Sequence, residues 1–124
     1  MHYLMVFIGG GFGSVLRFAI SRWMPVEPGQ MPWATLCANL ISCVLLGFLF
    51  MFLLDRSDVT YNQKLFFTVG FCGGFSTFST FSMENMQLLQ GEHFTLLALN
   101  IVGSVVLGIA GIWLGFQIAR WLLF

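Results

Sequence analysis

Four long apolar runs dominate this chain and limit what it can fold into. They cover residues 3–24, 32–54, 64–90 and 94–124, and each reaches the roughly 20 residues that an α-helix needs to cross a bilayer core. The composition agrees, because 58% of the 124 residues are hydrophobic and 8% are charged. We therefore predict an all-α, multi-pass membrane protein with four transmembrane helices, folded as a single domain over residues 1–124.

Charge and cysteine content argue against several other classes of protein. Lys plus Arg equal Asp plus Glu at 5 each, so no excess of positive charge indicates a nucleic-acid partner. Three cysteines lie in apolar runs without a C-x-x-C pair, and we expect buried free thiols rather than a metal site or a disulfide. The N-terminus lacks both the basic residues and the cleavage site of a signal peptide, so we expect the first run to remain. Partners are to be sought inside the lipid bilayer.

The distribution of basic residues gives only a weak orientation signal. With four spans, one side of the membrane would hold Arg56, Lys64 and Arg120, and the other Arg22 with Arg17 one turn deeper. The side richer in Lys and Arg usually faces the cytoplasm. A difference this small predicts that the chain can insert either way up.

Small residues recur four positions apart, which is the spacing that lets membrane helices approach closely. The pairs are Gly9 and Gly13, Gly10 and Ser14, Gly70 and Gly74, Ser104 and Gly108, and Gly111 and Gly115. Each pair is consistent with packing the helices of one chain together. Their number favours tight assembly of more than one copy.

Adjacent glycines, Gly73 and Gly74, lie about a third of the way along the third run. Glycine weakens helices, and irregular backbone at membrane depth is tolerated where it is buried in protein or lines a polar cavity. We predict a broken third helix at this point. Carbonyls released there, such as those of Gly73 and Ser76, would suit a small cation. A kink that serves only packing is an equal alternative.

The segment FSTFSTFS, residues 75–82, follows the glycines. Phe75, Phe78 and Phe81 are three apart, so each is displaced by about 60° around the helix and together they form a slanting aromatic ridge. Hydroxyls fill the intervening positions, at Ser76, Thr77, Ser79, Thr80 and Ser82. Hydroxyl hydrogens and the electropositive edges of phenyl rings face an anion favourably. This lining predicts a path for a small, hard anion.

Two other runs carry asparagines. Asn39 has Thr35 one turn before it, and Asn100 has Ser104 one turn after it. Each amide is costly in an apolar helix unless it has a partner or lines a pathway. Singly, each is explained as well by a hydrogen bond between helices; together with the third run, they favour the pathway.

Two charged residues complete the set of candidates. Arg17 lies near the end of the first run, where it can extend to the interface or attract anions to a vestibule. Glu84 follows the FSTFSTFS segment by one turn and could orient Arg17, a serine or Asn85. Intramembrane charges of this kind are functional candidates.

At these residues the chain resembles the Fluc (CrcB) family of small bacterial fluoride channels, and the resemblance covers nearly the whole sequence. GGGFGSVLRF, residues 9–18, resembles the family's glycine-rich first helix, and TLCANLISCVLLG, residues 35–47, its asparagine-bearing second helix. GFCGGFSTFSTFS, residues 70–82, resembles the family signature closely, and NIVGSVVLG, residues 100–108, is similar to the fourth helix.

The resemblance implies an antiparallel, dual-topology homodimer with two pores in the bacterial inner (plasma) membrane, which exports fluoride passively and confers fluoride resistance. Phe78 and Phe81 would meet fluoride with their ring edges, and Asn39 would be the pore asparagine. The polar track would contain Ser79, Thr80, Ser82, Ser104 and Thr35. A structural sodium ion would lie at the dimer centre, held by the main-chain oxygens of Gly73 and Ser76 from both copies.

Rival functions lack the features that they require. A proton-coupled small multidrug-type exporter would need a membrane-embedded carboxylate, and residues 3–24 contain none. A membrane subunit without transport activity would not require the hydroxyl and phenylalanine array together with Asn39. His2 and His93 lie at the ends of runs without a ligand cluster, so we do not expect an enzyme.

Overall fold

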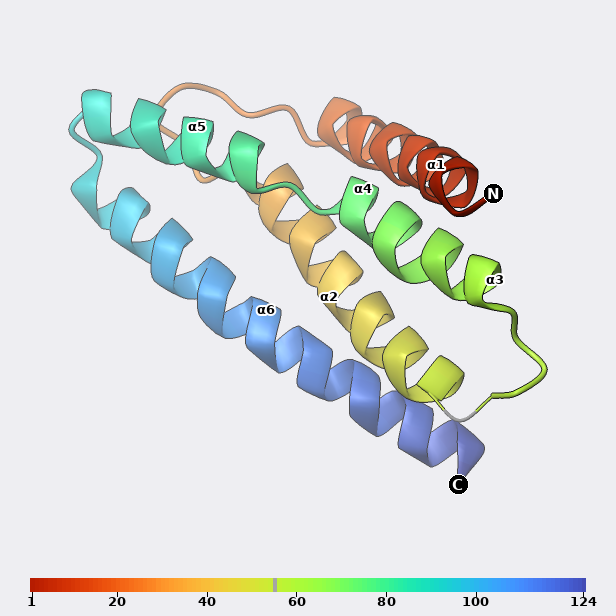
Figure 1. Ribbon diagram of the computed structural model, residues 1–124. Helices are drawn as coiled ribbons and strands as arrows, with labels where there is room; N and C mark the ends of the chain where they lie inside the picture. The colour runs from red at the N-terminus through yellow and green to blue at the C-terminus, as the bar shows by residue number, and fades with distance from the viewer. Residues whose placement is uncertain (55) are drawn as a thin grey trace.

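The computed structural model describes residues 1–54 and 56–124, and the secondary structure of this part is helical without strands (Figure 1). Its elements are α1 (His2–Trp23), α2 (Trp33–Leu54), α3 (Tyr61–Leu65), the π-helix η1 (Phe66–Cys72), α4 (Gly73–Phe75), α5 (Phe78–Gln90) and α6 (Phe94–Leu123). Four helical segments are long and apolar enough to cross a membrane, the third running from Tyr61 to Gln90. The prediction of an all-α, multi-pass membrane protein is confirmed.

The third segment begins three residues before the predicted residue 64. Thr60 caps α3, because its side chain accepts a hydrogen bond from Gln63 N while the Gln63 side chain accepts one from Thr60 N. This reciprocal pair satisfies two free amides at a helix start. The start of α3 lies in a polar stretch of sequence, so the hydropathy of the chain does not predict a helix there.

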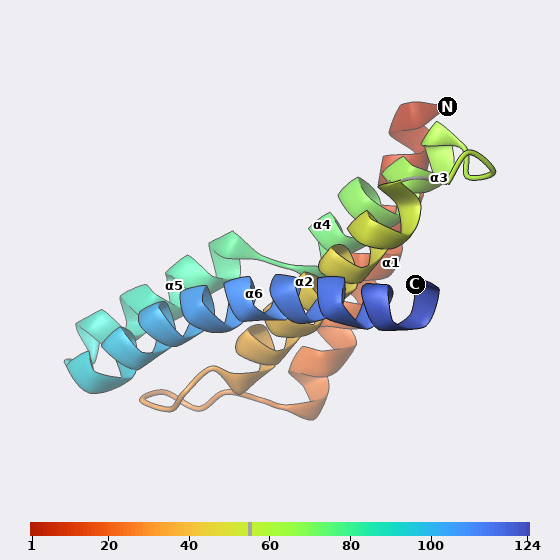
Figure 2. The ribbon, with the colours of Figure 1, turned by 90° about the horizontal axis from the view of Figure 1, so that it is seen from below.

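The two chain termini lie at one end of the molecule, near the end of α2 and the start of α3 (Figure 1). The short connections from α1 to α2 and from α5 to α6 lie at the opposite end (Figure 1). Helix α1 packs along η1 and α4, α2 packs along α6, and α5 lies beside the first half of α6 (Figures 1 and 2).

Close approach of backbones explains the small-residue spacing. A Cβ atom on Gly9 or Gly13 would collide with carbonyl oxygens of η1, and one on Gly74 with the backbone of Gly10. On the other side of the molecule, a Cβ on Gly115 would collide with the carbonyl of Val44 in α2. These contacts lie within one chain, so the glycine spacing does not argue for a second copy.

The three cysteines are free, with Cys72 buried and Cys37 and Cys43 half-buried. The expectation of buried thiols therefore holds for Cys72 and not for Cys37 and Cys43.

Candidate functional site

The backbone leaves the helical conformation between α4 and α5. Ser76 has φ −79° and ψ 155°, and Thr77 has φ −149° and ψ 121°, both in the extended region. Sequence analysis placed the interruption at Gly73 and Gly74, and this position is wrong because both residues are helical. Their lack of a side chain serves contact with α1 instead, at the surface where Gly74 meets Gly10.

Thr77 ends the interruption by starting α5. Its Oγ1 accepts a hydrogen bond from Thr80 N at 3.2 Å, the usual arrangement of a threonine at a helix N-terminus. Thr80 Oγ1 lies 3.2 Å from the same oxygen and Ser79 Oγ lies 3.3 Å from it. The hydroxyl-rich sequence therefore caps the new helix as well as lining its surface.

Asn39 on α2 fixes the interruption from the side. Thr77 N donates to Asn39 Oδ1 at 2.8 Å, and Asn39 Nδ2 donates to Thr77 O at 3.4 Å. The backbone N–H and C=O of Thr77 are thus both hydrogen-bonded to a side chain, in place of the partners that a helix would provide. The Asn39 side chain thus forms hydrogen bonds between α2 and the third segment, and part of its hydrogen-bonding capacity holds the backbone of Thr77.

Two carbonyls at the interruption lose the donors that a continuous helix would supply. In such a helix, Gly73 O would accept from Thr77 N, and Ser76 O from Thr80 N. Here Thr77 N donates to Asn39 and Thr80 N donates to the Thr77 hydroxyl. Hard cations prefer oxygen ligands, so the two carbonyls named from the sequence have the chemistry of cation ligands. In the part of the chain that the structure describes, no group of three or more His, Cys, Asp or Glu side chains offers an alternative metal site.

A cavity of about 290 Å³, which we call the Phe cavity, borders the interruption. It brings together four residues predicted for the pore, from three helices: Asn39 of α2, Phe78 and Phe81 of α5, and Ser104 of α6. The two phenyl rings lie 5.9 Å apart between centroids, tilted by 42°. The rest of its lining consists of Cys43, Ser76, Thr77, Val105 and Gly108.

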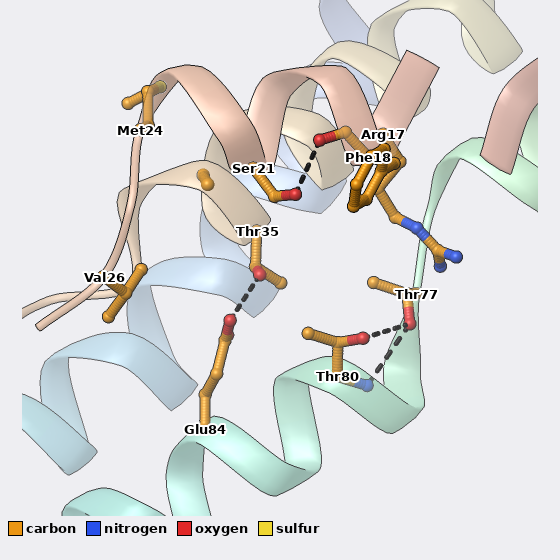
Figure 3. Close-up of a pocket in the computed structure, with 10 residues that line it drawn as sticks. Arg17, Phe18, Ser21, Met24, Val26, Thr35, Thr77, Thr80 and Glu84 are labelled. Carbon is orange, nitrogen blue, oxygen red and sulfur yellow. Dashed lines mark hydrogen bonds between the residues drawn. The ribbon is translucent and has the colours of Figure 1, made fainter. Parts of the chain in front are cut away.

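A second cavity of about 390 Å³, the Arg cavity, shares Thr77 with the Phe cavity and is drawn in Figure 3. Its lining includes Arg17, Thr35, Thr80 and Glu84, and Figure 3 shows the Arg17 guanidinium directed toward Thr77. Because Thr77 borders both cavities, the Phe cavity adjoins a cavity whose lining carries both a basic side chain, Arg17, and an acidic one, Glu84.

Glu84 is held by α2. Thr35 Oγ1 donates to Glu84 Oε1 at 2.6 Å, a short bond of the kind that a carboxylate makes with a hydroxyl. The other oxygen, Oε2, is buried without a hydrogen-bond partner among the described residues. Arg17 and Glu84 form no ion pair within residues 1–54 and 56–124, so the partner of Glu84 is Thr35 and not Arg17, a serine or Asn85.

The predicted polar track is only partly assembled. Ser79 and Ser82 are exposed on α5 and line neither cavity. Thr35 and Thr80 line the Arg cavity, whereas Ser104 lines the Phe cavity.

Sequence reasoning missed two polar contacts at the site. Thr77 appeared only as one hydroxyl among several, although it borders both cavities. Ser42 Oγ donates to Cys72 O at 2.9 Å from a buried position. The signal for Ser42 was available, because Thr35, Asn39 and Ser42 are spaced four and three residues apart and form one polar stripe on an otherwise apolar helix.

The fold and the site define a small multi-pass membrane protein with polar side chains gathered around a non-helical pair of residues. The sequence profile of the family described as "CrcB-like protein, Camphor Resistance (CrcB)" matches residues 4–116. The chain belongs to this family, and the resemblance drawn from its motifs is confirmed.

Curated relatives cover almost the whole chain. A protein of Phocaeicola vulgatus is 42% identical over 113 residues, which are 90% of this chain and 93% of the relative. One of Coxiella burnetii is 41% identical over 122 residues, covering 97% and 98%, and one of Thermococcus kodakarensis is 41% identical over 117 residues, covering 94% of each. All three relatives are named "Fluoride-specific ion channel FluC".

Proposed function

We propose that this protein is a fluoride-selective ion channel that lets fluoride leave the cell down its electrochemical gradient and so confers fluoride resistance. The observation that carries the proposal is the Phe cavity, where an amide, a hydroxyl and two phenyl rings converge, in a chain whose relatives are named as fluoride channels. Hydrogen fluoride enters cells as a neutral acid and ionises in the more alkaline cytoplasm. The trapped anion then needs a protein route out.

The chemistry of the Phe cavity suits a small anion. Fluoride holds its hydration shell tightly, so donors must replace water along the path. Asn39, Ser104 and the ring edges of Phe78 and Phe81 supply such donors, and the lining contains no acidic side chain. A ring-edge contact contributes only about 1 kcal/mol, so several groups must act together. A narrow passage of this kind would select against chloride by size.

The Arg cavity would serve as the vestibule. Arg17 supplies a positive charge close to Thr77 (Figure 3), which raises the local concentration of anions. Thr35 holds one oxygen of Glu84, which keeps the carboxylate engaged beside this cavity. Thr80 in the vestibule and Ser79 and Ser82 on the exposed face of α5 would pass the ion between sites.

The channel would be an antiparallel, dual-topology homodimer with two pores. Phe78 is 79% exposed in one chain, so a partner that covers this side would close the Phe cavity. The weak difference in basic residues between the two sides is consistent with insertion in both orientations. A third span broken inside the membrane is tolerable in such an assembly, because irregular backbone must be buried in protein or line a cavity.

A sodium ion would be held at the dimer centre by the carbonyls of Gly73 and Ser76 from both copies, where it would link the two chains. Two observations support this site. The helix donors of both carbonyls are engaged elsewhere, and a Cβ on Gly73 would meet nothing within 4 Å, so this stretch of backbone is open to a second copy.

The rival exporter has little support. Glu84 would be its only candidate carboxylate at membrane depth among the described residues, and this group is bonded to Thr35. The relatives are named as ion channels, and a channel in the bacterial inner membrane requires no coupled proton.

Growth of a bacterium that lacks its own fluoride exporters tests the proposal. Cells that express this protein should grow on acidic medium with fluoride at concentrations that stop cells carrying an empty plasmid, and chloride at equal concentration should affect neither strain. Failure to protect, from protein detected in the membrane fraction, would overturn the proposed function.

A further inference from the structure

Two asparagine side chains meet between α5 and α6, the two helices that lie side by side in Figures 1 and 2. Asn100 Nδ2 donates to Asn85 Oδ1 at 2.8 Å. Asn100 is 1% exposed and Asn85 9%, and neither lines the Phe cavity. Because the nitrogen of the Asn100 amide is occupied by Asn85, the amide has one orientation, and its oxygen is left for another donor.

That donor is Ser104, which lies one turn later on α6 and lines the Phe cavity. Ser104 Oγ donates to Asn100 Oδ1 at 3.4 Å. Two other hydroxyls, those of Thr68 in η1 and of Ser76 directly after α4, behave differently: each donates to the carbonyl four residues earlier, at 2.8 and 3.1 Å. Ser104 therefore bonds to the side chain of the residue whose carbonyl would be its ordinary acceptor.

The choice of acceptor decides what the Ser104 hydroxyl can do for an anion. A bond to the backbone carbonyl would turn the hydrogen toward the helix and hold it there. Ser104 Oγ and Asn100 Oδ1 lie 3.4 Å apart, which is beyond the usual oxygen-to-oxygen distance of hydroxyl hydrogen bonds. Such a contact is weak, so an anion in the cavity can take the hydrogen at small cost.

We propose that Asn85 and Asn100 form a positioning pair that keeps the Ser104 hydroxyl available to the anion in the Phe cavity. Asn85 orients the Asn100 amide, and Asn100 diverts Ser104 from the backbone. Neither asparagine touches the ion. The inference rests on the proposed function, because the anion is the fluoride that would pass through this cavity.

A double-mutant cycle on fluoride efflux tests the pair. The full-length protein, Asn100→Leu, Ser104→Ala and the double variant are each reconstituted in liposomes, and the release of loaded fluoride is followed with an electrode. We expect Asn100→Leu to slow release about tenfold, the effect of one hydrogen bond of moderate strength. In the Ser104→Ala background, the same substitution should slow release no further. Equal slowing in both backgrounds, or no slowing in either, would overturn the inference.

A second variant separates positioning from packing and covers a failure of Asn100→Leu to fold. Asn85→Leu combined with Asn100→Leu replaces the pair by two apolar side chains and leaves no buried amide without a partner. This protein should fold and still release fluoride slowly, whereas a rate equal to that of the unsubstituted protein would show that the pair only packs the helices. Thr68→Val is the matched control, because it removes a helical hydroxyl away from both cavities and should leave the rate unchanged. If the unsubstituted protein releases no fluoride, the proposed function itself fails; if it releases fluoride without the coupling to Ser104, only the inference fails.

Discussion

The packing surfaces of this protein and the surroundings of Thr77 meet the demands of a membrane in opposite ways. Along α2 and α6, glycines remove side chains so that backbones touch: a Cβ on Gly47 would collide with the carbonyl of Ile112, and one on Gly115 with that of Val44. At Thr77 the backbone leaves the helix, and side chains supply the hydrogen bonds that it has lost. One region is held by the absence of side chains and the other by their polar groups.

This contrast separates stability from conduction. Helices that touch through glycine gain dispersion contacts and gain no site for a solute. The interruption gains donors and two adjoining cavities. Substitutions at the glycine contacts should therefore change unfolding, and substitutions around Thr77 should change fluoride flux in protein that remains folded.

The largest expected effect is at Phe81. Phe81→Ile removes a ring that lines the Phe cavity while keeping an apolar side chain. Fluoride efflux from liposomes should fall about a hundredfold or more, because the proposed ring-edge donor acts jointly with the amide and the hydroxyl. The assembly should elute unchanged in size-exclusion chromatography. Phe50→Ile is a matched control on α2, at a ring that is 51% exposed and outside both cavities. Undiminished efflux in Phe81→Ile would contradict the role of the ring.

A slightly smaller loss is expected at Asn39. Asn39→Leu removes both bonds to the backbone of Thr77, and two hydrogen bonds of about 1 kcal/mol each predict that efflux slows by about thirtyfold. Ser42→Ala on the same helix removes the bond to Cys72 O. That carbonyl still accepts from Ser76, so efflux in Ser42→Ala should stay within about threefold of the unsubstituted protein. Equal losses in the two variants would show that Asn39 has no special part in holding the interruption.

Stability, rather than flux, should respond to glycines in α1. A Cβ on Gly13 would collide with the carbonyl of Phe71 and lie 2.7 Å from Phe75 N, whereas one on Gly11 would meet nothing within 4 Å. Gly13→Ala should cost about 1–3 kcal/mol, as overpacking does, and lower the midpoint of thermal unfolding in detergent. Gly11→Ala should leave the midpoint unchanged or raise it. The same unfolding midpoint for both variants would show that the close backbone contact at Gly13 does not contribute to stability, and the contrast between glycine contacts and the surroundings of Thr77 would then fail.

The smallest effect concerns the bond between Thr35 and Glu84. Thr35→Val removes the donor to Oε1, and Oε2 is already without a partner. The carboxylate, which already lines the Arg cavity, is then free to turn further into it and repel anions. We expect efflux to slow about threefold, in keeping with a partly solvated charge.

Glu84→Gln in the Thr35→Val background supplies the control. Removing the negative charge should restore efflux, because the repulsion no longer exists. If the double variant remains as slow as Thr35→Val, the bond acts on packing and not through the charge of Glu84.

Much of the fold could be predicted from the sequence because hydropathy decides it. Runs of apolar residues longer than a bilayer core have few alternatives to helices, and four helices able to span are present. The glycine contacts are harder to predict. The spacing of Gly9 and Gly13 indicates that their helix packs closely against another helix, but it does not indicate which helix that is. In the structure that helix is η1 of the same chain.

The candidate site was predicted in its members and less well in its arrangement. Asn39, Phe78, Phe81 and Ser104 do share one cavity. The low helix propensity of glycine favours an interruption at Gly73 and Gly74. Both residues are nevertheless helical, in a segment where Gly74 packs against Gly10 of α1. The true position of the interruption depends on Asn39, which lies 38 residues away from Thr77 in sequence and offers it a non-helical partner. Helix propensity is a property of each residue by itself, so it cannot predict a contact between residues that are far apart in sequence.

Efflux of fluoride from liposomes would show whether this protein conducts the ion. Vesicles containing the purified protein are loaded with potassium fluoride or potassium chloride, and release is followed with ion-selective electrodes before and after addition of a potassium ionophore. We expect rapid fluoride release that begins only when the ionophore is added, because a passive channel moves net charge. We expect no release of chloride. Fluoride release without the ionophore, equal release of chloride, or no release above that of protein-free vesicles would contradict the proposed function.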